Sequence, residues 1–243
     1  AQGWTQRYFY PGFNDKTGGL LRETDLFERQ KAFDKEAWLA QFLTPNKLDF
    51  SETTTYISLF CYEPTALEAL IDQLSTRETP TCLLITAGRA TAAVKALLEH
   101  KKRLQPTYLL AEKLSILYIP QLTQTDYDHL LWSCDFNFVR GEDSLVRAIW
   151  AAKPFIWQIY PQHDGAHHAK LDAFLEMMDA PESLKSAHKA WNAATHGAPF
   201  PALELSHWAQ SAQNLSNRLR LEEDLASNLI AFTTLQSEKQ LKS

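Results

Sequence analysis

Glycine is scarce in this sequence, with eight residues among 243. Two kinds of phosphate-binding loop require glycine at fixed spacing, and neither is present. No segment reads Gly-x-Gly-x-x-Gly, and Thr86-Ala87-Gly88-Arg89 lacks the Lys-Ser or Lys-Thr ending of a phosphate loop. The Gly-x-Ser-x-Gly turn of serine hydrolases is missing too. We therefore expect neither NAD-dependent nor ATP-dependent chemistry.

Cysteine is equally rare, and its three residues form no pattern. Cys61, Cys82 and Cys134 lie far apart, and each is embedded in an apolar segment. An odd, scattered set is typical of buried thiols in a reducing cytoplasm rather than of disulfides or a metal site.

A histidine-rich segment, His163-Asp164-Gly165-Ala166-His167-His168, contains groups that can ligate zinc. The adjacent His167 and His168 would point to different sides of a helix, and no third well-spaced ligand follows. We therefore expect a helix to start here and no metal to be bound. His163 or Asp164 could still line a ligand site, because the segment follows a predicted strand.

Long apolar runs are absent as well. No stretch approaches the roughly 18 to 20 apolar residues that a membrane span requires, and residues 1–4 do not start a secretory signal. The formal net charge is −5, with Lys and Arg scattered rather than gathered in a stripe. We expect a cytoplasmic protein that binds neither nucleic acid nor a membrane surface.

From Tyr56 onward, short apolar segments alternate with amphipathic ones, a pattern that predicts an α/β fold with a Rossmann-like parallel sheet covered by helices on both faces. The predicted strands are 56–61, 81–86, 114–119, 136–139 and 155–159. Predicted helices are 26–43, 64–74, 90–100, 126–134, 143–152, 167–178, 181–195 and a long final helix over 203–241.

Ligands of open parallel sheets bind beyond the carboxyl ends of the strands. The turn after the fourth strand is the richest in polar groups, and it reads Arg140-Gly141-Glu142-Asp143-Ser144. In one interpretation Asp143 or Ser144 only caps the next helix. In the other, the helix amides, Arg140 and the Ser144 hydroxyl receive a diphosphate, while Glu142 and Asp143 accept hydrogen bonds from sugar or ribose hydroxyls.

Two other turns carry aromatic and amide side chains. Phe60 and Tyr62 follow the first strand; Phe60 could be a core residue, whereas the Tyr62 hydroxyl could reach a phosphate or sugar. After the third strand, Gln121, Gln124 and Tyr127 offer the groups needed to read and stack on a pyrimidine. The alternative for this loop is a helix start capped by Thr125 or Asp126.

Together these segments resemble the protein-arginine rhamnosyltransferases that modify bacterial elongation factor P. The resemblance covers nearly the whole chain. It is carried by Arg7-Tyr8-Phe9-Tyr10-Pro11-Gly12-Phe13, Thr17-Gly18-Gly19-Leu20-Leu21-Arg22-Glu23, Ser58-Leu59-Phe60-Cys61-Tyr62-Glu63, Leu131-Trp132-Ser133-Cys134-Asp135-Phe136-Asn137, Arg140-Gly141-Glu142-Asp143-Ser144 and Ile159-Tyr160-Pro161-Gln162.

The resemblance implies a metal-independent, inverting glycosyltransferase of the two-domain GT-B type, with dTDP-β-L-rhamnose as donor and elongation factor P as acceptor. It implies that this chain is the donor-binding portion. Residues 1–53 would then be a remnant of the N-terminal domain, 54–229 the nucleotide-sugar-binding domain, and 230–243 a helix that returns to the N-terminal domain. The acids that activate the acceptor would lie before Ala1, so we expect donor binding but negligible transfer by this chain.

The resemblance also implies a role for each site residue. Arg140, Glu142 and Asp143 would orient the donor and stabilise the leaving group, and Ser144 would help to hold diphosphate and sugar. Phe60 and Tyr62 would flank the nucleotide sugar. Gln121, through its main chain, and Gln124 would meet thymine or ribose, and Tyr127 would pack on the base. The alternatives are a GT-B transferase with another nucleotide sugar or acceptor, a non-catalytic nucleotide-binding module, and a purely structural α/β domain.

Overall fold

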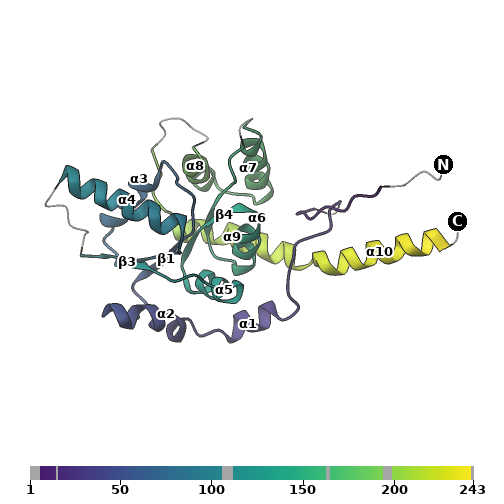
Figure 1. The fold of residues 1–243 in the computed structure, drawn as a ribbon, viewed down its shortest axis with the longest axis horizontal. Coiled ribbons are helices and arrows are strands. Elements are labelled where there is room, and N and C mark those ends of the chain that lie inside the picture. Colours follow the sequence, from purple (N-terminus) through teal and green to yellow (C-terminus); the bar gives the residue numbers. More distant parts are fainter. Residues whose placement is uncertain (1–5, 15, 106–111, 163–164, 194–198, 242–243) are drawn as a thin grey trace. The chain divides into compact units, whose positions relative to one another are not determined.

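A computed structural model describes residues 6–14, 16–105, 112–162, 165–193 and 199–241. Its centre is a five-stranded sheet in the order β3-β2-β1-β4-β5, in which every neighbouring pair is parallel (Figure 1). The predicted α/β class and all five predicted strands are confirmed. The strands are β1 (Thr55–Leu59), β2 (Thr81–Ile85), β3 (Leu114–Tyr118), β4 (Phe136–Arg140) and β5 (Phe155–Gln158).

Helices cover both faces of this sheet, as predicted. α3 and α4 lie on one face, whereas α2 and α5 pack on the other against β1, β2 and β3 (Figure 1). The helices are α1 (Leu26–Ala32), α2 (Lys35–Leu43), the short 3-10 helix η1 (Thr44–Asn46), α3 (Leu67–Ser75), α4 (Arg89–Leu104), α5 (Gln124–Ser133), α6 (Gly141–Ala151), α7 (Ala166–Met177), α8 (Glu182–Trp191), α9 (Leu205–Arg220) and α10 (Leu225–Leu241).

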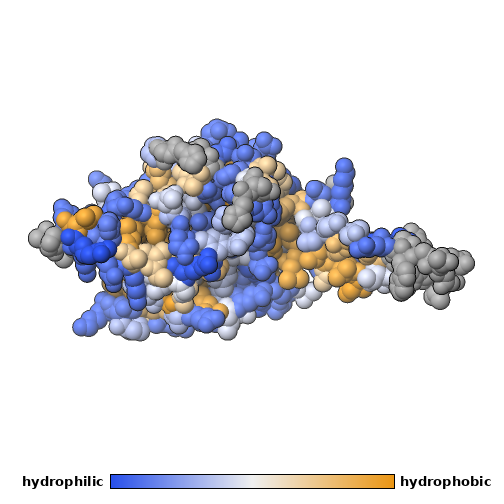
Figure 2. All heavy atoms as spheres, turned by 45° about the horizontal axis from the view of Figure 1, so that its top comes forward, coloured by the Kyte–Doolittle hydropathy of each residue, from blue (hydrophilic) through white to orange (hydrophobic). Residues whose placement is uncertain are grey.

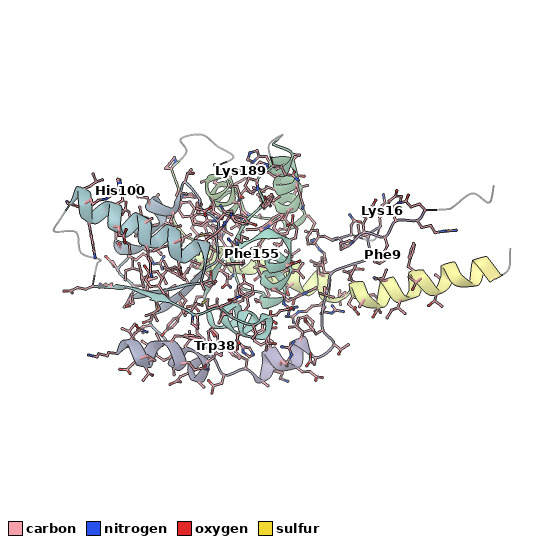
Figure 3. All side chains as sticks on the ribbon, viewed as in Figure 1. Phe9, Lys16, Trp38, His100, Phe155 and Lys189 are labelled. Atoms are coloured by element: carbon pink, nitrogen blue, oxygen red, sulfur yellow. The ribbon has the colours of Figure 1, made fainter. Side chains whose placement is uncertain are left out.

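The strands are apolar because the sheet is buried on both faces. Every residue of β1, β2 and β5 is buried, and Phe155 lies in the middle of the densely packed side chains (Figure 3). Cys61, Cys82 and Cys134 are free thiols in this interior, as predicted. Burial raises the pKa of Cys61 to about 12, so its thiol stays protonated.

Two predicted helices are each divided by an aspartate. The segment 26–43 forms α1 and α2, because the Asp34 carboxylate accepts a hydrogen bond from the Ala37 amide (3.0 Å) and starts a new helix. The segment 203–241 forms α9 and α10 for the same reason. There the Asp224 carboxylate accepts bonds from the amides of Ala226 (2.9 Å) and Ser227 (3.1 Å).

The chain divides into two compact units, one formed by residues 33–216 and the other by residues 1–32 with 217–243. These bounds differ from the predicted ones at 53 and 230. Residues 33–53 pack with the sheet because Trp38, Leu39 and Leu43 of α2 belong to the same buried cluster as Tyr56 of β1. That residues 1–53 and 230–243 belong with a further domain stays a prediction.

The smaller unit is held together by its own contacts. The Leu225 amide donates to the Leu20 carbonyl (3.0 Å). The ring of Phe9, which is labelled in Figure 3, lies 5.3 Å from the ring of Phe232 between centroids. Its surface carries many exposed apolar side chains (Figure 2), a property typical of surfaces that contact another protein part. These side chains are Tyr8, Tyr10, Leu21, Leu221, Leu229, Ile230 and Leu235. No helix among the described residues is long and apolar enough to cross a membrane.

Two side chains at the end of α8 hydrogen-bond to the backbone of β5. The His188 Nε2 atom accepts from the Trp157 amide (3.1 Å). The Asn192 side chain accepts from the Ile159 amide (2.9 Å) and donates to the Trp157 carbonyl (2.8 Å). His188 is fully buried, and its Nδ1 lies 3.1 Å from the Leu184 carbonyl, so the ring is neutral with the proton on Nδ1.

This histidine makes stability depend on pH. Burial lowers the pKa of His188 from 6.5 to about 4. The unfolded state therefore binds the proton more readily, and the stabilisation is complete above pH 6.5 and lost as the pH falls towards 4. We expect a loss of roughly 3 kcal/mol over that range. Urea unfolding at several pH values, for the native chain and for His188→Gln, measures this loss of unfolding free energy. An equal dependence of the unfolding free energy on pH in the two proteins would contradict the prediction.

Candidate functional site

The site lies where the direction of strand addition reverses. From β1 the chain proceeds to β2 and β3 on one side, and then returns to place β4 on the other side of β1. A crevice forms beyond the carboxyl ends of two such strands, and ligands of α/β sheets bind there. Phe60 and Tyr62 follow β1, and Arg140 ends β4. The structure therefore brings together two segments that were predicted separately from the sequence.

Arg140 is the centre of this site. Its guanidinium carbon lies 4.3 Å from the centroid of the Phe60 ring and 4.6 Å from that of Tyr62. One of its nitrogens, Nη1, donates a hydrogen bond to the Cys61 carbonyl (3.1 Å). Two cation–π contacts and one hydrogen bond thus hold a positive charge at the crevice. Phe60 is half-buried and contacts this charge, so it is part of the site rather than only of the core.

Gly141 lets α6 begin directly after β4. Its φ of +68° is in the left-handed region, and an added Cβ would lie 3.5 Å from the Tyr62 hydroxyl. The Gly141 carbonyl accepts a hydrogen bond from the Trp157 indole (2.8 Å). This hydrogen bond fixes the start of α6 against β5.

The predicted capping role of Asp143 or Ser144 is wrong. Because Gly141 adopts a positive φ, α6 begins at that residue, and Arg140 occupies the cap position without a side-chain cap bond. The buried Ser144 hydroxyl instead accepts from the Arg140 amide (3.0 Å) and donates to the Arg140 carbonyl. Ser144 thus fixes the backbone that carries the guanidinium, and its direct contact with a diphosphate stays a prediction.

The two acids of the turn are both exposed in the first turn of α6. The Glu142 carboxylate pairs with the ammonium of Lys170 on α7 (2.8 Å). This pair is solvent-exposed, so it contributes little to stability, but it partly neutralises Glu142 next to Arg140. Asp143 has its carboxylate in solvent, which agrees with a role in accepting hydroxyl hydrogen bonds.

Tyr127 of α5 extends the site on its β3 side. Its ring meets the Phe60 ring edge-on, with centroids 5.5 Å apart. Burial raises the pKa of Tyr127, and the neighbouring Ser144 hydroxyl only partly offsets this effect. The residues predicted to read a pyrimidine, Gln121 and Gln124, are both exposed at the same edge of the sheet. α5 is capped by Thr123, which accepts from the Asp126 amide (3.1 Å), so the predicted caps Thr125 and Asp126 are wrong.

The Tyr62 hydroxyl is a hydrogen-bond donor at neutral pH. Burial raises the pKa of Tyr62, and the nearby Arg140 guanidinium only partly offsets this effect. The backbone next to the ring is fixed because the Tyr62 amide donates to the Gln158 side chain (2.7 Å). A neutral phenol held in this way can donate to an anionic ligand.

Two residues at this edge were missed by the sequence reasoning. Tyr160, which follows β5, meets the Tyr62 ring edge-on with centroids 5.9 Å apart. Arg89, which follows β2, has its guanidinium carbon 5.6 Å from the centroid of the same ring. Both lie in the turns that follow predicted strands, and that position is the signal that could have identified them. His163 and Asp164, which were also considered, lie outside the described residues.

A buried ion pair joins the two helices that begin at the site. On α6, the Arg147 guanidinium donates from Nε to one oxygen of Asp128 (2.6 Å) and from Nη2 to the other (2.5 Å). Asp128 lies on α5, and both side chains are buried, with 7% and 3% of their surface exposed. The pair therefore fixes α5 against α6, and with them Tyr127 and Arg140.

Comparison with known proteins decides the family. Residues 1–234 match the family model described as Elongation-Factor P (EF-P) rhamnosyltransferase EarP. The chain belongs to the EarP family. It is 38% identical over 242 residues to a protein-arginine rhamnosyltransferase of Pseudomonas aeruginosa, a match that covers 96% of this chain and 64% of that protein. The corresponding protein of Pseudomonas putida is 37% identical over 240 residues, covering 95% and 64%.

The fold of a solved EarP structure agrees as well. That structure shows the basis for EarP-mediated arginine glycosylation of translation elongation factor EF-P. It shares 33% sequence identity with this chain at a TM-score of 0.76, over 93% of this chain and 75% of the other. The chain spans 64% of the length of the two Pseudomonas relatives. This part contains the parallel sheet with its switch point.

Proposed function

We propose that this chain binds dTDP-β-L-rhamnose at the crevice between β1 and β4, and that the enzyme to which it corresponds transfers rhamnose to an arginine of elongation factor P. The observation that carries the proposal is the Arg140 guanidinium, held between the Phe60 and Tyr62 rings at the switch point of the sheet. Membership of the EarP family supports the choice of sugar and acceptor. Modification of a translation factor would take place in the cytoplasm.

The donor would be held by groups of three kinds. Its diphosphate would meet the Arg140 guanidinium, the Tyr62 hydroxyl and the amides of the first turn of α6, where the helix dipole favours negative charge. The Glu142 and Asp143 carboxylates would accept hydrogen bonds from sugar hydroxyls. The base would pack on Tyr127, with the Gln121 main chain and the Gln124 side chain contacting thymine or ribose.

The reaction would be a single displacement with inversion. A nitrogen of the acceptor arginine attacks the anomeric carbon, the bond from that carbon to the diphosphate oxygen breaks, and the arginine proton passes to a carboxylate. An arginine side chain is a poor nucleophile because it is protonated below a pH of about 12 and its lone pair is delocalised. Carboxylates must therefore orient it and accept its proton. We place that general base outside this chain.

This chain would stabilise the leaving group. Negative charge accumulates on the diphosphate as the anomeric bond breaks, and fixed donors aimed at that charge lower the barrier. Arg140, the Tyr62 hydroxyl and the α6 amides are such donors, and Ser144 holds the Arg140 backbone in place. With this set we propose that the reaction proceeds without a metal ion.

Calorimetric titration of this chain with dTDP-β-L-rhamnose and with UDP-glucose tests the proposal. We expect the thymidine donor to bind at least about tenfold more tightly, a difference of about 1.4 kcal/mol. A preference for UDP-glucose would indicate another GT-B transferase, and binding without transfer by the longer family protein would indicate a nucleotide-binding module. Absence of transfer by the isolated chain stays a prediction, which mass spectrometry of elongation factor P after incubation with chain and donor tests.

A further inference from the structure

Arg89 lies at the same edge of the sheet as Arg140 but comes from a different strand end. It is the first residue of α4, the helix that follows β2 after a three-residue turn. Its guanidinium carbon lies 5.6 Å from the Tyr62 ring centroid, and Arg140 contacts the same ring at 4.6 Å. Three strand ends, those of β1, β2 and β4, thus bring two guanidinium groups to one tyrosine.

The ring contacts show the order in which these side chains follow one another along the site. Tyr127, which we place at the base of the nucleotide, touches Phe60. Phe60 and Tyr62 both contact Arg140, and Arg89 contacts Tyr62. A nucleotide with its base at Tyr127 and its first phosphate at Arg140 would extend its second phosphate towards Arg89.

Arg89 is held only weakly by its ion-pair partner, Glu63. Its Nε atom lies 3.9 Å from a carboxylate oxygen of Glu63, and the side chains are 60% and 62% exposed. An ion pair this long and this exposed contributes almost nothing to stability. A phosphate, by contrast, accepts two parallel hydrogen bonds from the planar guanidinium. Exchange of Glu63 for a phosphate would therefore cost little stability.

We propose that Arg89 binds the outer phosphate of the nucleotide diphosphate, and that it makes the site selective for diphosphates over monophosphates. This inference rests on the proposed function, because it requires a thymidine nucleotide at the switch point. Arg140 fixes the nucleotide in either case, whereas Arg89 contacts only the phosphate that a monophosphate lacks. Arg89 is thus a specificity-determining residue that acts together with Arg140.

Calorimetric titration of this chain with dTDP and with dTMP tests the inference. Arg89→Gln should weaken dTDP binding about tenfold and change dTMP binding less than about twofold, since it removes charge-assisted bonds to one phosphate. Arg89→Lys should give an intermediate loss, because lysine keeps the charge but not the planar fork. The matched control is Arg103→Gln, which makes the same change in the last turn of the same helix and should bind both nucleotides as the native chain does.

The outcomes separate the two proposals. Selective loss of dTDP binding in Arg89→Gln, with native thermal unfolding, supports the role of Arg89. Equal dTDP affinity in Arg89→Gln and Arg103→Gln overturns it, and so does an equal loss for dTDP and dTMP, which would indicate a structural effect. In both cases the proposed function stands if the native chain binds dTDP. Failure of the native chain to bind either nucleotide overturns both proposals.

Discussion

Replacement of Arg140 by alanine is expected to weaken the binding of dTDP-β-L-rhamnose to this chain by about 100-fold or more. The substitution removes the charge that Phe60 and Tyr62 hold at the crevice. Each hydrogen bond between a charged group and a phosphate contributes about 1.5–3 kcal/mol, so the loss of two amounts to roughly 3 kcal/mol or more. Calorimetric titration of the native chain and of the variant measures the difference.

The control for this experiment is Arg140→Lys. Lysine keeps the positive charge, but it has no planar group to stack on the rings and cannot donate two parallel hydrogen bonds to a phosphate. We therefore expect its affinity for the donor to lie between those of the native chain and of the alanine variant. Thermal unfolding checks that removal of the bond to the Cys61 carbonyl has not disturbed the fold. A well-folded alanine variant that binds the donor within about threefold of the native chain would show that the diphosphate lies elsewhere.

The second large effect concerns the Asp128–Arg147 pair. Either Asp128→Ala or Arg147→Met leaves one charge buried without its partner, which costs about 3–5 kcal/mol. Replacement of both residues, as in Asp128→Leu with Arg147→Met, leaves no buried charge and should restore most of the lost stability. Urea unfolding of the native chain, the two single variants and the double variant gives the four unfolding free energies of a double-mutant cycle. Single variants within about 1 kcal/mol of the native chain would contradict the prediction.

The pair also predicts an effect on binding. α5 carries Tyr127 and α6 begins beside Arg140, so a shift of one helix against the other separates the base-binding and phosphate-binding groups. We therefore expect weaker donor binding in the single variants even at a temperature where they remain folded. Titration of the four proteins of the same cycle, below their unfolding transitions, checks this expectation.

The sheet could be predicted from the sequence because its strands are buried on both faces and read as short apolar runs. The helix boundaries could be predicted less well from the sequence. Across residues 26–43 and 203–241 the apolar spacing hardly changes at Asp34 or Asp224, although each carboxylate starts a new helix. An aspartate inside an apolar repeat has the same sequence signature whether it caps a helix or faces solvent, so periodicity alone could not separate the two cases.

The candidate site was only partly predictable, for a reason that lies in the strand order. Position after a strand was enough to select Phe60, Tyr62 and Arg140 individually. Their mutual contact depends on β4 lying beside β1, although 76 residues separate the two strands in the chain. The ion pair between Asp128 and Arg147 likewise depends on how α5 packs against α6, which no local pattern records.

The contacts between α8 and β5 have a consequence for the behaviour of the protein at high concentration. β5 is the outermost strand on its side of the sheet, and outermost strands offer free amides and carbonyls to which another chain can add a strand. Here the Trp157 amide and carbonyl and the Ile159 amide are already engaged by His188 and Asn192. The side chains of His188 and Asn192 thus occupy backbone groups that a sixth strand would use. They protect this edge of the sheet from pairing with another chain, and so from aggregation.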